Sequence, residues 1–286
     1  MIYFKTKIWR IFELVIVVMI FLFFTTISII HASVLMTDYQ NRIDSLRILS
    51  YNMRIAHPPS KGWSEVDLPA IAQVINKANP DFVALQEVDA FTERSGKKIH
   101  QAHELAKMTG MYHFFAKGID RSAGDYGVAI LSRFPLTETK GYRLPVRDSI
   151  KNEIRALAVV KAQLSNEETI VFCSAHFDHL ANEDRLLQAE TMNAILDKYS
   201  ANPVIIGADL NMEPDNQVMK VIQEAFSLGV DNHPLTFPAE NPQRTIDYIL
   251  LNKTAKDKFK IVKYTTLKEE YASDHLPIEV LLEELP

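Results

Sequence analysis

The chain has 286 residues, of which 47% are hydrophobic and 23% are charged. This composition excludes an intrinsically disordered chain, and the length is sufficient for one large hydrophobic core. Its 31 basic and 36 acidic residues give a formal net charge of −5, which is not the strongly basic balance typical of nucleic-acid-binding chains. The single cysteine, Cys173, excludes an intramolecular disulfide framework and a cysteine-rich zinc site.

The first 37 residues differ from the rest of the chain. Lys5, Lys7 and Arg10 precede an uncharged apolar run at residues 14–30. With the apolar residues before Glu13, this run approaches the roughly 20 residues that span a bilayer. The positive flank predicts one transmembrane helix with a cytoplasmic N-terminus and an extracytoplasmic remainder. Because the run is longer than a usual signal-peptide core, we expect an uncleaved anchor in residues 1–37; cleavage and secretion is the alternative.

Residues 38–286 are predicted to form one catalytic domain, because neither a repeat nor a low-complexity linker interrupts them. Residues 1–37 hold three of the 31 basic and one of the 36 acidic residues, which leaves 28 and 35 and a formal net charge of −7 for the domain. Non-specific DNA binding depends on a basic face. The acidic net charge of the domain therefore argues against a nucleic-acid substrate, although it does not exclude a local basic groove. The oligomeric state is not predicted, and a monomer is assumed.

From about residue 46, short apolar stretches alternate with segments of helical periodicity. The predicted strands are Leu46–Tyr51, Phe82–Gln86, Val128–Ser132, Arg155–Leu164, Thr169–Ala175, Val204–Gly207, Ile246–Leu251 and Ile278–Leu282. The predicted helices are Asp67–Lys77, Ile99–Met108 and Glu183–Tyr199. The segment LSNEETI is predicted to be a hairpin turn between neighbouring strands. The mixture predicts an α/β fold, a four-layer sandwich of two packed mixed sheets flanked by helices.

Polar side chains stand at the ends of six of these predicted strands. In chain order they are Asn52, Glu87, His176 with Asp178, Asp209 with Asn211, Asp247, and Asp274 with His275. Each is unremarkable alone, since Asn and Asp are common turn residues. Strand ends gathered at one edge of a sandwich, however, place their side chains in one cleft. The set therefore predicts an active site.

Seven short motifs occur in order between Leu46 and Leu282: YNM, LQEV, YGVAILSRFP, SAHFDH, GADLN, TIDYIL and SDHLP. Each is weak alone, but in this order they resemble the endonuclease/exonuclease/phosphatase superfamily. That superfamily includes secreted DNases, abasic-site endonucleases, bacterial sphingomyelinases and inositol-phosphate phosphatases. The resemblance implies a DNase I-like, metal-dependent phosphoesterase.

The chemistry of phosphate-ester hydrolysis requires these residue types. A cation must neutralise charge on the phosphoryl oxygens, a water must be activated, and the leaving oxygen must be stabilised. Carboxylate and carboxamide oxygens suit Mg²⁺, or alternatively Mn²⁺, better than zinc. Glu87 is the expected principal ligand, with Asn52 beside it. Asp274 is expected close enough to hold a second ion or a metal-bound water.

The resemblance also implies the catalytic roles. Asp209 would orient or deprotonate the attacking water, and Asn211 would fix the phosphate. His275, paired with Asp247, would stabilise the phosphoryl transition state or transfer a proton. His176 resembles the secreted DNase, sphingomyelinase and inositol phosphatase branches rather than the abasic-site endonucleases. Which histidine is the acid and which the base stays open.

Two further residues are weaker candidates. Tyr126 either reaches the phosphate with its hydroxyl group or only packs at the start of a strand. Arg155 either contacts the substrate phosphate or pairs with Glu153. Asp178 and His179 extend the polar cluster, but we interpret them as a turn-capping acid and a surface histidine.

The sequence thus predicts a membrane-anchored, extracytoplasmic, Mg²⁺-dependent hydrolase of phosphate esters. The acidic domain and the anchor favour a membrane-proximal phospholipid headgroup or a small phosphoester as the substrate. An extracytoplasmic DNase is the alternative. A non-catalytic phosphate-binding module is the alternative of another class, disfavoured because every motif acid and histidine is present. The fold does not select among these substrates.

Overall fold

The computed structural model describes residues 45–148, 152–164 and 168–285. The predicted membrane helix within residues 1–37 lies outside these ranges. Inside them, no helix is both long enough and apolar enough to cross a bilayer.

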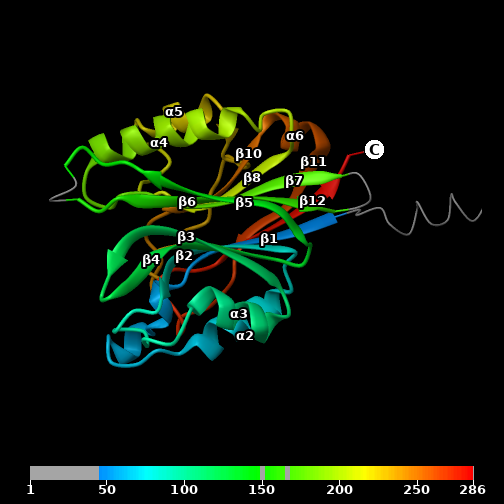
Figure 1. The fold of residues 1–286 in the computed structure, drawn as a ribbon. Coiled ribbons are helices and arrows are strands. Elements are labelled where there is room, and N and C mark those ends of the chain that lie inside the picture. Colours follow the sequence, from blue (N-terminus) through cyan, green and yellow to red (C-terminus); the bar gives the residue numbers. More distant parts are fainter. Residues whose placement is uncertain (1–44, 149–151, 165–167, 286) are drawn as a thin grey trace, which may run out of the picture. The chain divides into compact units, whose positions relative to one another are not determined.

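The described residues form two six-stranded mixed sheets (Figure 1). The strands are β1 Ser45–Asn52, β2 Phe82–Ala90, β3 Tyr112–Arg121, β4 Gly124–Ser132, β5 Leu136–Leu144, β6 Arg155–Gln163, β7 Thr169–His176, β8 Val204–Asp209, β9 Phe226–Ser227, β10 Asp247–Asn252, β11 Phe259–Thr266 and β12 Ile278–Glu284. The first sheet has the order β11-β12-β1-β2-β4-β3, and the second has β5-β6-β7-β8-β10-β9. The pairs β1/β2 and β7/β8 are parallel, and the other pairs are antiparallel.

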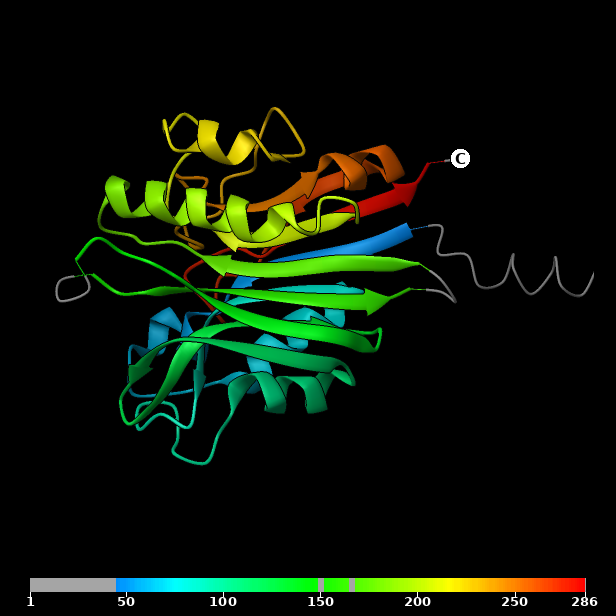
Figure 2. The same ribbon diagram turned by 45° about the horizontal axis from the view of Figure 1, so that its top comes forward.

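Helices cover the outer face of each sheet. They are α2 Leu68–Ala78, α3 Gln101–Thr109, α4 Asn182–Asp197, α5 Met219–Gln223 and α6 Lys253–Lys258, with the short 3₁₀ turns η1 Arg54–Ala56 and η2 Pro59–Lys61. One buried cluster joins α2 and α3 to β1, β2 and β4, and another joins α4 and α5 to the second sheet. Figure 2 shows α4 lying across the second sheet. The predicted four-layer α/β sandwich is therefore confirmed.

The predicted elements agree with the structure in the interior of each sheet. The eight predicted strands are β1, β2, β4, β6, β7, β8, β10 and β12, all flanked by neighbours on both sides. The three predicted helices are α2, α3 and α4, each within two residues of its predicted bounds. Residues 165–167 of the predicted hairpin turn lie outside the described residues, but the strands on either side, β6 and β7, pair antiparallel with Gln163 opposite Thr169, as a hairpin requires. The helices α5 and α6 and the strands β3, β5, β9 and β11 were not predicted from the sequence.

The two sheets pack closely through their inner faces. Phe82 of β2 stacks on Phe172 of β7 with ring centroids 4.9 Å apart. Gly207 of β8 faces the first sheet, where a Cβ atom added to it would lie 2.5 Å from Ala84 Cβ and 2.9 Å from Ser50 Oγ. The absence of a side chain at Gly207 therefore sets the spacing between the sheets.

We expect Gly207→Ala to lower the free energy of unfolding by about 1–3 kcal/mol, the usual cost of overpacking a core. Urea unfolding measures this effect. The matched control is Gly141→Ala in β5, because Gly141 is exposed and its added Cβ would lie no closer than 3.1 Å to Ala116 Cβ. Equal stabilities of the two variants would contradict the packing argument.

Candidate active site

The site lies at one edge of the sandwich because eight strands end or begin there. β1 and β2 run parallel and end at this edge, as do β7 and β8. Their antiparallel partners β4, β6, β10 and β12 begin at the same edge. Polar residues that are far apart in the sequence therefore meet in one pocket.

The pocket has a volume of about 460 Å³. Eight of the ten predicted site residues line it: Glu87, Tyr126, Arg155, His176, Asp209, Asn211, Asp274 and His275. The other two, Asn52 and Asp247, are each 1% exposed. Asn52 donates a hydrogen bond to Glu87, and Asp247 shares one with His275, so each is in direct contact with a lining residue. The structure thus brings all ten predicted residues together.

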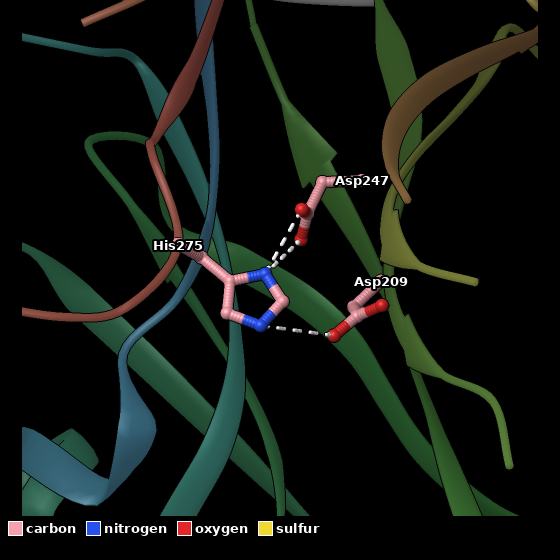
Figure 3. A group of neighbouring side chains, drawn as sticks. All are labelled: Asp209, Asp247 and His275. Atoms are coloured by element: carbon pink, nitrogen blue, oxygen red, sulfur yellow. Dashed lines mark hydrogen bonds and ion pairs between the residues drawn. The ribbon is translucent and has the colours of Figure 1, made fainter. Parts of the chain in front are cut away.

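His275 lies between two buried carboxylates (Figure 3). Its Nδ1 is 2.9 Å from Asp247 Oδ2, and its Nε2 is 3.8 Å from Asp209 Oδ2. Asp247 and Asp209 are opposite each other in the antiparallel pair of β10 and β8, so the sheet register fixes their spacing. The predicted pairing of His275 with Asp247 is present.

These three groups change one another's proton affinity. Burial alone lowers the pKa of His275, but the charge and hydrogen bond of Asp247, together with Asp209 and Asp274, raise it to about 10. Burial and the nearby Asp247 raise the pKa of Asp209 to about 7, although His275 and the hydrogen bond from Asn52 act in the opposite direction. A cationic imidazole thus stands beside a carboxyl group that titrates near neutral pH.

His176, the second histidine of the site, has a lowered pKa, whereas that of His275 is raised. Its Nε2 is 3.0 Å from Asn211 Nδ2, which has only hydrogens to offer, so the ring nitrogen accepts. Burial, and secondarily the charge of Arg155, lower the pKa of His176 well below its usual value. Asn211 has a left-handed φ of 52°, which asparagine tolerates, and its N–H donates to Asp209 Oδ1 at 2.9 Å. His176 is therefore neutral where His275 is charged.

Glu87 is directed into the pocket by a β-bulge in β2. The register of β2 against β4 shifts between Leu85 and Val88, so that two residues of β2 oppose one of β4. Glu87 has a φ of 55°, an unfavourable value for a residue with a side chain, and such strain recurs at functional sites. Among the described residues, the only hydrogen bond to its carboxylate comes from Asn52 Nδ2 at 3.2 Å.

Asn52 connects Glu87 to the rest of the site. Its Nδ2 also donates to Asp209 Oδ2 at 2.8 Å, and its Oδ1 accepts from the N–H of Arg54 at 3.0 Å. The Arg54 side chain reaches Asp274 Oδ2 at 3.2 Å. Arg54 at the start of η1 therefore connects two of the three predicted metal ligands, Asn52 and Asp274.

Two sets of donors at this edge could hold a metal ion. Asp209, Asp247 and His275 each offer a ligand atom, and these atoms lie within 4.8 Å of one another. The second set comprises the three predicted ligands Glu87, Asn52 and Asp274. Its oxygen donors that line the pocket are the carboxylates of Glu87 and Asp274, whereas Asn52 turns its Nδ2 to Glu87 and its Oδ1 accepts from the N–H of Arg54. Within the part of the chain that the structure describes, the half-buried Glu87 carboxylate accepts one hydrogen bond, from the neutral Asn52, so it retains oxygen lone pairs for a hard cation. The residues present thus fit a divalent ion with oxygen ligands.

Arg155 lines the pocket as a buried cation. It is 4% exposed, and its guanidinium lies 3.7 Å from Glu153 and 3.8 Å from Asp178, both beyond hydrogen-bond distance. Its Nη2 contacts His179 Nδ1 at 2.8 Å, and its Nε has no partner among the described residues. The Nε atom is itself buried, so a phosphate oxygen would meet the part of the guanidinium that lines the pocket.

Of the remaining weaker candidates, Tyr126 and His179 line the pocket, and Asp178 caps a turn. Tyr126 is 9% exposed, and burial, with the nearby Glu87, raises the pKa of its hydroxyl group well above the usual value. Asp178 caps a turn as predicted, since its Oδ2 accepts from the N–H groups of Leu180 and Ala181 at 2.7 and 2.8 Å. His179 is exposed as predicted, but it also lines the pocket beside Arg155.

Sequence reasoning missed several pocket residues: Ile55, Trp63, Arg94, Arg121, Phe237, Arg244 and Ile246. Most of them lie in loops outside the recognised motifs. Arg94 donates two hydrogen bonds of 2.8 Å to the buried Asp89 carboxylate. The one sequence feature that could have indicated Arg94 is its position in TERSG, a few residues after a predicted strand that is followed by acidic residues.

A two-sheet sandwich with this acid, amide and imidazole cluster at one edge defines the class of metal-dependent phosphoesterases. The model of the endonuclease/exonuclease/phosphatase family matches residues 49–275. The chain belongs to this family, as its motifs predicted. A comparison with curated proteins finds no match.

Solved structures share the fold. A family protein from Bacteroides thetaiotaomicron has 20% identity and a TM-score of 0.67, with 83% of this chain and 97% of that chain covered. A mannosyl-6-phosphatase from the same species has 19% identity and a TM-score of 0.66, with 83% and 99% covered. The catalytic domain of human nocturnin has 17% identity and a TM-score of 0.62, with 85% and 96% covered. At these identities the likeness establishes the fold alone.

Proposed function

We propose that the protein is a Mg²⁺-dependent phosphoesterase whose domain hydrolyses a membrane-proximal phospholipid headgroup or a small phosphoester outside the cytoplasm. The observation that carries this proposal is one pocket that joins a cation-binding side, a buried arginine and a charged histidine. Glu87, Asp274, Arg155 and His275 all line it. The solved relatives that include a mannosyl-6-phosphatase support the reaction class.

Each side chain of the pocket has its own role in the proposed hydrolysis. Asp209 stands where it can accept the proton of an attacking water, since its carboxyl group titrates near neutrality and such groups are efficient general bases. Arg155 binds a non-bridging phosphate oxygen. Asn211, whose Nδ2 donates to His176 Nε2 and to the carbonyl oxygen of Phe177, holds the His176 ring in place. His275, held by Asp247, stabilises negative charge as it develops.

We place the metal at Glu87, Asn52 and Asp274 rather than at Asp209, Asp247 and His275. Nδ1 of His275 already bonds Asp247 at 2.9 Å, and an ion there would compete with that bond. Bound Mg²⁺ would neutralise charge on the phosphoryl oxygens. The oxygen-rich donor set favours Mg²⁺ or Mn²⁺ over zinc.

A substrate panel tests the proposal. The full chain, purified in mild detergent, is assayed on phosphatidylinositol phosphates, sphingomyelin, sugar phosphates, a chromogenic phosphodiester and plasmid DNA, with Mg²⁺, Mn²⁺ or EDTA. We expect metal-dependent turnover of a lipid or small phosphoester and its loss in EDTA.

Three results would contradict this expectation. Undiminished turnover in EDTA would refute the metal dependence. Plasmid nicking far faster than turnover of lipids or small esters, with a steep salt dependence that indicates several phosphate contacts, would favour the DNase alternative. Absence of turnover with every substrate would favour a phosphate-binding module.

A further inference from the structure

Large apolar side chains are exposed mainly around the active-site pocket. Of the nine exposed ones among the described residues, five belong to loops at the site edge: Trp63 (65% exposed), Phe91 (50%), Leu180 (61%), Leu235 (46%) and Tyr271 (40%). We call these five the apolar rim. Trp63 itself lines the pocket, and each of the others lies within three residues of a lining residue. The other four are Met108, Tyr112, Val262 and Leu285.

The apolar rim comes from five separate loops. Trp63 precedes α2, Phe91 follows β2, Leu180 precedes α4, Leu235 precedes β10, and Tyr271 precedes β12. Isolated exposed apolar residues are normal on a protein surface, but here five of the nine lie in loops that also supply pocket residues. Single protruding side chains suit a fluid interface, which fills the spaces between them, better than a rigid protein groove.

Charges at this edge are largely paired. Lys97 lies 2.7 Å from Glu93, and Arg244 lies 3.0 Å from Glu213. Arg121 also pairs with Glu153. Because these cations are compensated and the domain as a whole is acidic, attraction to an anionic surface is not the driving force. The edge instead matches a zwitterionic surface, with aromatic side chains at its interface.

We propose that the apolar rim inserts into the interface of a zwitterionic phospholipid bilayer and brings the pocket to a phosphoester held in that membrane. This inference rests on the proposed phosphoesterase function and names where its substrate resides. The uncharged apolar run at residues 14–30 of the same chain supports the choice of a bilayer as the partner. Tethering would raise the effective concentration of the domain at the surface, so that five side chains suffice.

Trp63 provides a direct reporter. The guanidinium of Arg54 lies 4.3 Å from the centroid of its ring, and the ring of His57 lies 5.5 Å away, so these two groups support the indole. The chain has two tryptophans, Trp9 and Trp63. In the full chain carrying Trp9→Phe, all tryptophan emission comes from Trp63.

The experiment reconstitutes this chain in phosphatidylcholine vesicles with or without brominated acyl chains, which quench only nearby indoles. We expect quenching and a blue shift of Trp63 emission, unchanged in 1 M NaCl. Phe91→Ser with Leu180→Ser should weaken docking about tenfold or more, because each loses the burial of a large apolar side chain. The matched control, Val262→Ser with Leu285→Ser, should leave quenching unchanged.

Any of the following outcomes would contradict the proposal. Trp63 emission that is insensitive to bromination shows that the rim does not enter the bilayer. A blue shift independent of bromination, which grows with protein density, assigns the rim to a contact between protein copies. Quenching lost in high salt assigns it to charge. Turnover of a water-soluble chromogenic diester, with and without EDTA, is measured in parallel, so failure of the catalytic function is distinguished from failure of docking.

Discussion

Replacing His275 with alanine is expected to lower kcat by about 10²-fold or more, the usual contribution of a group in proton transfer or charge stabilisation. The imidazole lines the pocket, and the charges around it favour its cationic form. Asp247→Asn should also slow turnover, because Asp247 holds the ring at 2.9 Å and fixes its tautomer. Steady-state kinetics on the substrate identified by the panel measure both effects.

The double variant tests whether the two residues act as one unit. If they do, the combined loss is far smaller than the product of the single losses. His103→Ala is the matched control, since His103 is an exposed histidine outside the pocket. Fully multiplicative losses would show that His275 and Asp247 act independently. Thermal unfolding of each variant checks that the buried carboxylates left behind do not unfold the domain.

Replacing Glu87 with glutamine is expected to abolish most activity at low Mg²⁺, with partial recovery as Mg²⁺ is raised. The swap is nearly isosteric and removes the charge that attracts the cation. Because the Glu87 carboxylate accepts only one hydrogen bond among the described residues, from Asn52, the fold should survive. Activity titrated against Mg²⁺ concentration gives the shift in the apparent metal affinity.

This variant also separates the two donor sets. If the ion is held by Asp209, Asp247 and His275 instead, Glu87→Gln should reduce turnover without moving the Mg²⁺ titration. The control is Glu93→Gln, because Glu93 is exposed, pairs with Lys97 and lies at the same edge. A Mg²⁺ titration that is identical in the Glu87 variant and the wild type would refute the assignment of Glu87 as the principal ligand.

Interior strands were predictable from sequence, and edge strands were not, for one physical reason. The eight predicted strands have neighbours on both sides, and several are continuously buried, as β8 is from Val204 to Asp209. The missed strands β3, β5, β9 and β11 are the four sheet edges. β5, for example, alternates exposed and half-buried residues over most of its length. Without an apolar run, nothing in such a stretch distinguishes a strand from a loop.

The site residues were predictable because their types and positions are local properties. Asn52, Glu87, Asp209 and His275 each stand at the end of a recognisable strand, and their order matches the family motifs. Loop residues such as Trp63 and Arg94 carry no such signal. Their part in the pocket depends on how loops from distant segments converge.

The sequence by itself determined the fold class, the family and the chemical groups available to the site, since these follow from apolar periodicity and from motifs of a few adjacent residues. The tertiary structure alone decided how those groups act on one another. The bulge that aims Glu87, the opposition of Asp247 and Asp209 and the different environments of His275 and His176 arise from strand register and burial. These depend on contacts between residues far apart in the chain, which no local pattern encodes.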